Sequence, residues 1–404
     1  MSPYNPKSVG SCKIEDLIGK GGMAEVFLGV QESLERKVAV KALLRELKED
    51  AEATERFRRE ALALATLQHE NIVAVHDLIE KYNRLYIIME YVDGVDLATV
   101  LDEGPVPIDI GLIIGSELAS ALEHAHFRKV LHRDIKPANV MLSRTGQVKL
   151  TDFGIAKDQT RDDLTREGFV VGTPRYLSPE QVVGDRADWR SDIYSLGVLL
   201  YESLTGTKAY RGTNQAEIMV AVAKGQRRSL RERAPHLPRA LEKIIDRCMK
   251  LDPHKRYQRA TELRRDLDRL LAAVLKGNPA ARMVAFLKER GQVEPDDLTL
   301  LASDEVAAVE TVSKPSTVLS RMRVEINVVP PSYARRVGKA LLVVLLVLIC
   351  LSGAAAATWL LAPDKVQQAI AEVNVWIERS RRELREEIPP VAGDEQPPSP
   401  RGGG

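Results

Sequence analysis

The amino-acid sequence predicts an α+β protein in which a small sheet-rich part is followed by a larger helical part and then by one membrane-spanning helix. Short runs rich in β-branched residues alternate with turns over residues 13–41, which is typical of a hairpin-rich sheet. Residues 51–67 have the spacing of an amphipathic helix, and the strand-like runs "NIVAVHDLIE" and "RLYIIMEYV" follow it. From about residue 96 onward helical patterns dominate, and they predict helices over residues 109–128, 190–205, 214–224, 239–250 and 260–275.

The predicted membrane-spanning helix is the run "ALLVVLLVLICLSGAAAATWLLA", which carries no charge from residue 340 to residue 362. Roughly 20 apolar residues span a bilayer, and a buried helix of a soluble domain seldom stays apolar on all sides over that length. The run separates a long N-terminal part from a short C-terminal tail at 363–404.

Composition excludes several function classes. The formal net charge of +1 gives no reason to expect nucleic acid as a partner. The three cysteines, Cys12, Cys248 and Cys350, lie far apart and form no CxxC pair, which favours packed, reduced thiols over a zinc site or a disulfide framework. The first ten residues, "MSPYNPKSVG", contain no apolar stretch, so no cleaved signal peptide is predicted.

The stretch "IGKGGMAEV", residues 18–26, contains three glycines that would let backbone amides approach a phosphate. The third glycine of a G-x-G-x-x-G pattern is absent, because position 24 is an alanine. On its own such a stretch indicates either a nucleotide site or a flexible turn between two strands.

Four further stretches follow the glycines. "VAVK" places Lys41 on a strand, "HRDIKPANV" contains Asp134, "DFG" occupies residues 152–154, and "SPE" ends at Glu180. In this order and at these spacings they resemble the protein-kinase signature. The resemblance covers residues 11–275, and phrases such as "GTPRYLSPEQ" and "RSDIYSLGVLLYESLTG" are similar to the bacterial serine/threonine kinases of the eukaryotic (Hanks) type, many of which are membrane-anchored.

Phosphoryl transfer requires positioning and charge neutralisation, and the residues of the motifs fit these needs. Lys41 supplies a positive charge to the α- and β-phosphates, and Glu60 of the 51–67 helix is the carboxylate expected to hold it. Asp134 is the expected base for the substrate hydroxyl. Asn139 and Asp152 are hard oxygen ligands of the kind that Mg²⁺ prefers.

The resemblance implies the remaining roles. Lys136 matches the serine/threonine-specific form of the catalytic loop, and Thr173 matches the threonine that shapes the acceptor pocket. Glu90 and Val92 would hold adenine through their backbone, behind Met89. The implied nucleotide-binding set is Ile18, Gly19, Lys20, Gly21, Gly22, Met23, Ala24, Glu25, Val26, Ala39, Lys41, Glu90, Val92, Asp96 (to the ribose) and Met141. The implied cofactors are ATP and Mg²⁺, with Mn²⁺ as a substitute.

Other conspicuous residues have structural interpretations. His132 is expected to be a core histidine, and Phe153 and Leu64 are expected to pack between the two lobes of a bilobal fold. Glu180 is expected to form an ion pair with Arg256. The basic run "RRSLRERAPHLPR" is expected to be a solvated face.

Two rival functions remain open at this point. A catalytically dead scaffold with a kinase fold would be expected to lose Lys41, Asp134 or Asp152, and all three are present. A kinase of small molecules would lack the acceptor segment "GTPRYLSPE". The expected partners of a protein kinase are proteins with Ser/Thr acceptors.

The chain beyond the motifs predicts a single-pass arrangement in a bacterial inner membrane. Residues 276–339 read as a juxtamembrane linker, within which "ARMVAFLKERG" has helical spacing. Positive charges crowd the N-terminal flank of the span, at Arg335, Arg336 and Lys339, and ATP and Mg²⁺ require a cytoplasmic catalytic domain. The tail at 363–404 is therefore expected to be extracytoplasmic, and small residues in the span predict a weak homodimer.

A regulatory switch is predicted between "DFG" and "GTP". This segment carries Thr160 and Thr165, and Arg133 precedes the catalytic aspartate. Phosphothreonine carries about −1.5 to −2 charge, which a guanidinium meets well. In similar kinases two loop threonines lie two residues apart; here Thr165 occupies the first place and Glu167 the second.

Overall fold

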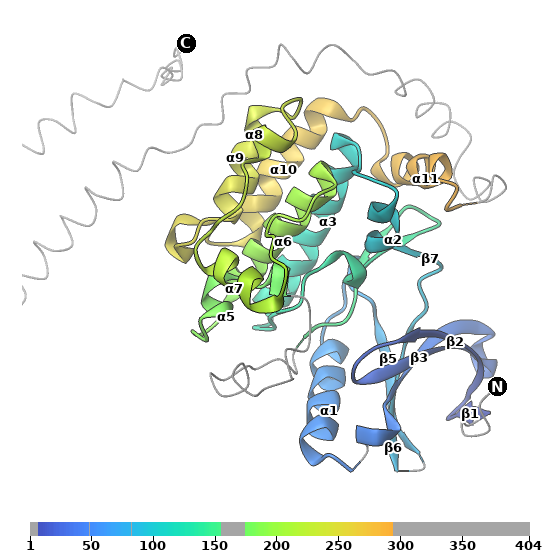
Figure 1. The fold of residues 1–404 in the computed structure, drawn as a ribbon. Helices are drawn as coiled ribbons and strands as arrows, with labels where there is room; N and C mark the ends of the chain where they lie inside the picture. The colour runs from blue at the N-terminus through green and yellow to red at the C-terminus, as the bar shows by residue number, and fades with distance from the viewer. Residues whose placement is uncertain (1–6, 48, 82, 155–173, 294–404) are drawn as a thin grey trace, which may run out of the picture. The chain divides into compact units, whose positions relative to one another are not determined.

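The computed structural model describes residues 7–47, 49–81, 83–154 and 174–293, and all of them belong to one compact unit of the chain (Figure 1). The N-terminal part is a six-stranded antiparallel sheet in the order β1-β2-β3-β4-β6-β5. Its strands are β1 (Ser8–Val9), β2 (Cys12–Lys20), β3 (Ala24–Gln31), β4 (Arg36–Leu43), β5 (Val75–Lys81) and β6 (Arg84–Glu90).

One helix, α1 (Ala51–Ala65), packs against this sheet, and its start is fixed by the sequence. The Asp50 side chain accepts hydrogen bonds from the amides of Glu52 and Ala53 at 2.9 and 3.0 Å, which satisfies two of the free N–H groups at the helix start. The predicted helix over 51–67 is confirmed. Phe57 and Ala61 of α1 pack with apolar residues of the sheet.

The alternation of side chains along β4 determines the face of the sheet on which Lys41 lies. Side chains alternate between the two faces of a strand. Val38 and Val40 pack on the face away from α1, whereas Ala39 and Leu43 pack on the face that α1 covers. Lys41 therefore lies on the α1 side of the sheet.

The helical part is built around α3 and α6, which contact each other, and α10 packs along α3. The predicted helices over 109–128, 190–205, 214–224, 239–250 and 260–275 are confirmed to within two residues at each end. Gly197 of α6 allows α9 to approach, because a Cβ there would lie 2.5 Å from Cys248 Cβ. The helices are α2 (Leu97–Asp102), α3 (Ile108–Phe127), α5 (Pro179–Val182), α6 (Trp189–Thr205), α7 (Gln215–Ala223), α8 (Leu230–Arg233), α9 (Arg239–Cys248), α10 (Ala260–Val274) and α11 (Pro279–Glu289).

A second, three-stranded sheet carries the catalytic motifs. Its strands are β7 (Gly94–Asp96), β8 (Val140–Ser143) and β9 (Val148–Leu150), in the order β7-β8-β9. The hairpin β8–β9 begins directly after Asn139 and ends two residues before Asp152. The hairpin therefore sets the separation of the two residues predicted to bind Mg²⁺.

Helix α11 lies within the stretch predicted as linker, 276–339, where the sequence indicated helical spacing. It packs as part of the helical core through Met283, Phe286 and Leu287. Arg282 Nε donates to Asp109 Oδ2 at 2.6 Å, which ties α11 to the start of α3. The packed structure thus continues beyond the expected boundary at residue 275, to Val293, which is also buried.

The turn of the hairpin β8–β9 contacts α11 closely. Gly146 has a φ of +82°, and a Cβ at this position would lie 2.2 Å from the carbonyl oxygen of Ala280. Only glycine meets both requirements, the left-handed backbone and the close approach.

The predicted ion pair between Glu180 and Arg256 is present. Two parallel hydrogen bonds of 2.7 Å join the guanidinium to the carboxylate, and Arg256 is almost completely buried. Burial alone would raise the pKa of Glu180, but the hydrogen bonds from Arg256 hold it below its ordinary value. The pair links α5 to the segment before α10 without contacting the catalytic residues.

Within the described residues no single helix is long and apolar enough to cross a membrane; α10 and α11 pass such a test only as a pair, bent by 71° at the break between them. The predicted span at 340–362, the tail at 363–404 and most of the linker lie outside the described residues.

Candidate active site

Lys41 contacts two carboxylates at once. Its Nζ lies 2.7 Å from Glu60 Oε1 and 2.9 Å from Asp152 Oδ1. Glu60 reaches it from α1, on the face of the sheet that the alternation of β4 requires, and Asp152 reaches it from the segment after β9. The structure therefore brings together three predicted site residues that are widely separated in the sequence.

These contacts hold the charges that phosphate and metal binding need. Burial alone would lower the pKa of Lys41, but Asp152 and Glu60 outweigh it and raise that pKa above its ordinary value. The charge of Lys41 in turn holds the pKa of Asp152 below its ordinary value. At neutral pH the ammonium group of Lys41 and the carboxylate of Asp152 are both charged.

Asp134 lies in the loop before β8, beside two other predicted residues. Its Oδ2 accepts a hydrogen bond from Lys136 Nζ at 2.8 Å, and Asn139 Nδ2 donates to Asp134 at its backbone carbonyl (2.8 Å) and at Oδ2 (3.2 Å). The carboxylate is thus fixed in orientation, as a base that must meet a hydroxyl requires.

Asp192 supports the loop that contains Asp134, a role that was not predicted from the sequence. It lies in the first turn of α6, is 1% exposed, and accepts from the amides of His132 at 3.0 Å and Arg133 at 2.8 Å. His126 Nε2 lies 2.8 Å from the same carboxylate. The backbone of Arg133 has a φ of +63°, which is unfavourable for residues other than glycine. The hydrogen bond from its amide to Asp192 holds it in this conformation.

His132 is confirmed as a core residue. It is fully buried, its Nε2 donates to the Thr151 carbonyl at 3.0 Å, and its ring lies 4.4 Å from that of Phe153. Burial lowers its pKa, so it is neutral. Phe153 and Leu64 belong to one apolar cluster, which joins α1 to the helical part as predicted.

The donor set of Asn139 and Asp152 fits a divalent cation of the Mg²⁺ type. Both hydrogen bonds of the Asn139 side chain leave through Nδ2, so its amide oxygen has no donor among the described residues. Asp152 is ionised, and only its Oδ1 is engaged by Lys41. One amide oxygen and one carboxylate oxygen are the hard ligands that such an ion takes.

The glycine-rich turn lies between β2 and β3. Gly21 N donates to the Ala24 carbonyl at 2.8 Å, and a Cβ at Gly22 would meet no atom within 4 Å. Ala24 belongs to β3 and is 6% exposed, with its methyl group in the apolar cluster between the sheet and α1. An alanine is therefore compatible with a phosphate-covering loop here, because its methyl group is buried in the sheet core.

The residues predicted around the adenine come from both sheets. Met89 and Ala39 are buried, whereas Val26, Val92 and Met141 are partly exposed. The Glu90 carboxylate lies 2.7 Å from Lys149 Nζ, so this side chain has a structural partner and only its backbone remains for adenine.

Asp96 has a structural role that its sequence position did not indicate. Its side chain caps α2 by accepting from the backbone and hydroxyl of Thr99 at 2.9 and 3.0 Å. The predicted regulatory residues Thr160, Thr165 and Thr173 lie outside the described residues.

This fold and this site define an ATP-dependent phosphoryl-transfer domain: two lobes, a glycine turn, a lysine held by a helix carboxylate, and a carboxylate base beside a pair of cation ligands. Residues 12–267 match the protein kinase domain family, and the chain belongs to it. The family implies the use of ATP and a divalent metal ion. The domain is that of a protein serine/threonine kinase, because the relatives that it matches are kinases of this specificity.

The chain is 39% identical over 259 residues to the serine/threonine-protein kinase PrkC of Bacillus subtilis, which covers 64% of this chain and 40% of PrkC. It is 40% identical over 266 residues to PknB of Mycobacterium leprae, covering 64% of this chain and 42% of that protein. The crystal structure of the Mycobacterium tuberculosis PknI kinase domain aligns with a TM-score of 0.53 and 27% identity over 67% of this chain and 99% of that domain. The chain thus spans about two fifths of the length of the curated relatives it matches.

Proposed function

We propose that the whole protein is a membrane-anchored protein serine/threonine kinase that phosphorylates itself and other proteins in signalling. The observation that carries the catalytic part of this proposal is the contact of Lys41 with Glu60 and Asp152 at 2.7 and 2.9 Å. A scaffold without catalysis has no need of a lysine balanced between a helix carboxylate and a potential metal ligand.

In the proposed reaction Lys41 binds the α- and β-phosphates of ATP, and Asp134 accepts the hydrogen bond of a serine or threonine hydroxyl. The hydroxyl oxygen forms a bond to the γ-phosphorus while the bond from that phosphorus to the bridging oxygen breaks, so ADP leaves and the hydroxyl proton passes to Asp134. Lys136, 2.8 Å from Asp134, neutralises negative charge beside the transferred group. Asn139 and Asp152 would hold a divalent cation, which would supply further charge neutralisation at the phosphates.

The test uses the purified full-length protein with γ-labelled ATP, Mg²⁺ and a generic protein substrate. We expect label on phosphoserine and phosphothreonine of the substrate and of the protein itself. If neither the substrate nor the protein itself is labelled although the protein binds ATP, the protein is a scaffold without catalysis. Label on a small-molecule acceptor alone would favour the other rival function.

We further propose that phosphorylation of Thr165 activates the enzyme by ordering the loop against Arg133. Arg133 is partly exposed and directly precedes Asp134, so a phosphate bound there would act on the catalytic loop. Hydrogen bonds to a charged group contribute about 1.5–3 kcal/mol, so Thr165→Ala is expected to lower kcat by about 10- to 100-fold. Thr160→Ala is the matched control and is expected to have a smaller effect.

Mass spectrometry of the active protein should find phosphate on Thr165. Undiminished turnover of Thr165→Ala, with a large loss in Glu167→Ala, would instead identify the permanent carboxylate as the group that orders the loop.

The membrane arrangement is proposed from the sequence: residues 340–362 cross a bacterial inner membrane, with the kinase domain in the cytoplasm and residues 363–404 outside. A reporter that is active only in the cytoplasm is expected to be silent when it is fused after Gly404. The same reporter fused after Val293 should be active. Strong activity after Gly404 would reverse the proposed arrangement.

Weak dimerisation is proposed through the small residues of the span, among them Gly353 and Ala357, which are four residues apart. Gly353→Ile is expected to reduce cross-linking of the full-length protein in membranes, because a bulky side chain prevents close approach of two helices. Ala355→Ile, on the opposite side of such a helix, is the control. Equal yields for both variants would remove the span from the interface.

A further inference from the structure

Helix α11 contacts the small sheet that carries the predicted cation ligands, although it lies beyond residues 12–267, which match the kinase family. At its start the carbonyl oxygen of Ala280 packs on the backbone of Gly146 in the turn of the hairpin β8–β9, and no side chain would fit between them. Asn278 accepts from the amide of Ala280 at 2.8 Å and caps the helix, which fixes this end of α11. The hairpin thus rests on a helix outside the matched range.

The hairpin carries this contact toward the catalytic residues. Asn139 directly precedes β8, and Asp152 follows β9 by two residues. The turn between the strands is closed by two hydrogen bonds of 2.9 Å, from the Ser143 amide to the Gln147 carbonyl and from the Gln147 amide to the Ser143 hydroxyl. The strands have only four and three residues, so a displacement of the turn is expected to move both ends that bear the cation ligands.

A second contact anchors the same turn near the adenine site. The Arg144 amide donates to the Asp93 carbonyl at 2.9 Å, and Arg144 Nε lies 3.1 Å from Asp93 Oδ1. Asp93 directly follows Val92, whose backbone is predicted to hold adenine. The turn therefore has two anchors, one beside the adenine site and one on α11, and loss of the α11 contact would leave the first in place.

Helix α11 is itself held firmly on the helical part (Figure 1). The side chains of Arg282 and Asp109, which join α11 to α3 at 2.6 Å, are only 12% and 17% exposed. At the other end of α11, Arg290 Nη2 donates at 2.8 Å to the carbonyl of Pro105, in the connection between α2 and α3. With its apolar face in the core as well, α11 is a rigid support for the turn.

We propose that α11 positions the nucleotide site: its contact with Gly146 sets the hairpin β8–β9 and thereby the placement of the cation ligands Asn139 and Asp152. Arg282 is a positioning residue in this arrangement, because its bond to Asp109 holds α11 in place. The inference rests on the proposed function, since it requires Asn139 and Asp152 to hold the cation that accompanies ATP. It assigns support of the reaction to a helix that makes no contact with the reacting groups.

The test uses the full-length protein in detergent and two measurements that need no turnover. Hydrogen exchange of the nucleotide-free protein, followed by mass spectrometry, reports the opening of peptides that cover the hairpin, residues 140–150. Calorimetry gives the Kd of an ATP analogue with a non-hydrolysable β–γ bridge, both in Mg²⁺ and in EDTA. Because neither measurement involves phosphoryl transfer, the outcome is independent of whether the protein proves to be an active kinase.

Gly146→Ala and Arg282→Gln should each speed up exchange in the hairpin by about 2- to 30-fold, the range expected for coupling through packed elements, while peptides of α6 exchange as in wild type. The Kd in Mg²⁺ should rise by a similar factor. The Kd in EDTA should change less, because the anchor at Asp93, beside the adenine site, remains. Arg282→Lys, which keeps a positive charge beside Asp109, should lie closer to wild type than Arg282→Gln.

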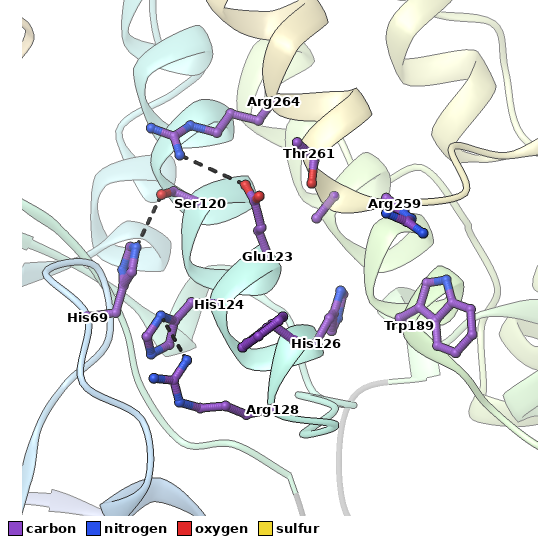
Figure 2. Close-up of a pocket in the computed structure, with 12 residues that line it drawn as sticks. His69, Ser120, Glu123, His124, His126, Arg128, Trp189, Arg259, Thr261 and Arg264 are labelled. Atoms are coloured by element: carbon purple, nitrogen blue, oxygen red, sulfur yellow. Dashed lines mark hydrogen bonds and ion pairs between the residues drawn. The ribbon is translucent and has the colours of Figure 1, made fainter.

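Two control variants make the same kinds of change away from the hairpin. Gly291→Ala places a side chain at a φ of +64°, comparable with the +82° of Gly146, but its Cβ would meet no atom within 4 Å. Arg264→Gln removes an arginine of α10 that contacts Glu123 at 4.0 Å, near the opposite end of α3 from Asp109 (Figure 2). That contact lies in a hollow of about 680 Å³, which is lined by none of the residues assigned to ATP, the cation or the acceptor hydroxyl. Both controls should keep the wild-type exchange rates and Kd values.

Three results would overturn the proposal. Unchanged exchange of the hairpin in Gly146→Ala and Arg282→Gln would show that α11 does not hold it. An equal rise of the Kd in Mg²⁺ and in EDTA would show that α11 does not set the cation ligands. Effects of Gly291→Ala or Arg264→Gln as large as those of their counterparts would reduce the result to a general loss of stability. Thermal unfolding identifies any variant that fails to fold, and if Gly146→Ala is one, the comparison of Arg282→Gln with Arg282→Lys decides.

Discussion

Replacement of Asp134 by asparagine is expected to lower kcat by about 10²- to 10⁴-fold, the range that general-base groups contribute. Asparagine keeps the shape of the side chain and can still meet Lys136 and Asn139, which now lie 2.8 and 3.2 Å from Asp134 Oδ2. It cannot take the proton of the acceptor hydroxyl. The loss should therefore appear in kcat for a protein substrate, with the KM for ATP and the unfolding temperature changing little.

The control for this variant is Asp185→Asn, which removes one exposed carboxylate from the helical part and leaves the loop untouched. Steady-state kinetics and thermal unfolding of both variants make the comparison. Retention of more than about a tenth of the wild-type kcat by Asp134→Asn would contradict the assignment of Asp134 as the base.

Asp192→Ala is expected to cost about 3–5 kcal/mol of unfolding free energy and to abolish most activity. The substitution leaves two buried amides, those of His132 and Arg133, without the acceptor that lies 3.0 and 2.8 Å away in the wild type. Arg133 would then lack the contact that holds its backbone at a φ of +63°. Denaturant unfolding and kcat, measured on the same preparation, test both effects.

Asp188→Ala is the matched control, because Asp188 lies one turn earlier on the same helix and caps it. Loss of a cap costs about 1 kcal/mol, so this variant should be much less affected. If Asp192→Ala were no less stable than Asp188→Ala, the proposed support of the catalytic loop would be wrong.

The difference in unfolding free energy between wild type and Asp192→Ala should depend on pH. Burial alone would raise the pKa of Asp192, but the hydrogen bonds from the His126 side chain and the His132 backbone outweigh it and hold the pKa below its ordinary value. A carboxyl group with a lowered folded-state pKa contributes its full stabilisation above its ordinary pKa, about 4, and loses it as the pH falls through the folded-state value. The difference in unfolding free energy between the two proteins should therefore be constant near neutral pH and shrink below about pH 4.

The sequence predicted the elements whose signals are local. Long helices such as α3 and α6 show clear periodicity, and the catalytic motifs occupy contiguous stretches, so their residues could be named from the amino-acid sequence alone. The short helices α2, α5 and α8 have four to six residues, too few for a periodic pattern to show.

The contacts that the sequence did not predict are those made across long separations. Asp192 acts on His132, 60 residues earlier, and nothing near Asp192 marks it as more than one charge in a helix. The available signal was that Asp192 belongs to the phrase "RSDIYSLG", which is similar to a phrase of known kinases. Ala24 was likewise interpreted by its position in the glycine pattern, whereas its burial depends on strand pairing with Leu43.

The position of Asp192 has a consequence for the order in which the enzyme is made. Ribosomes release a chain from its N-terminus, so Lys41, Glu60 and the loop around Asp134 emerge before α6 does. Until α6 emerges, the amides of His132 and Arg133 lack the acceptor that sets the catalytic loop. A nascent chain thus passes through a stage in which the sheet and α1 have emerged but the catalytic loop still lacks the acceptor that sets its conformation.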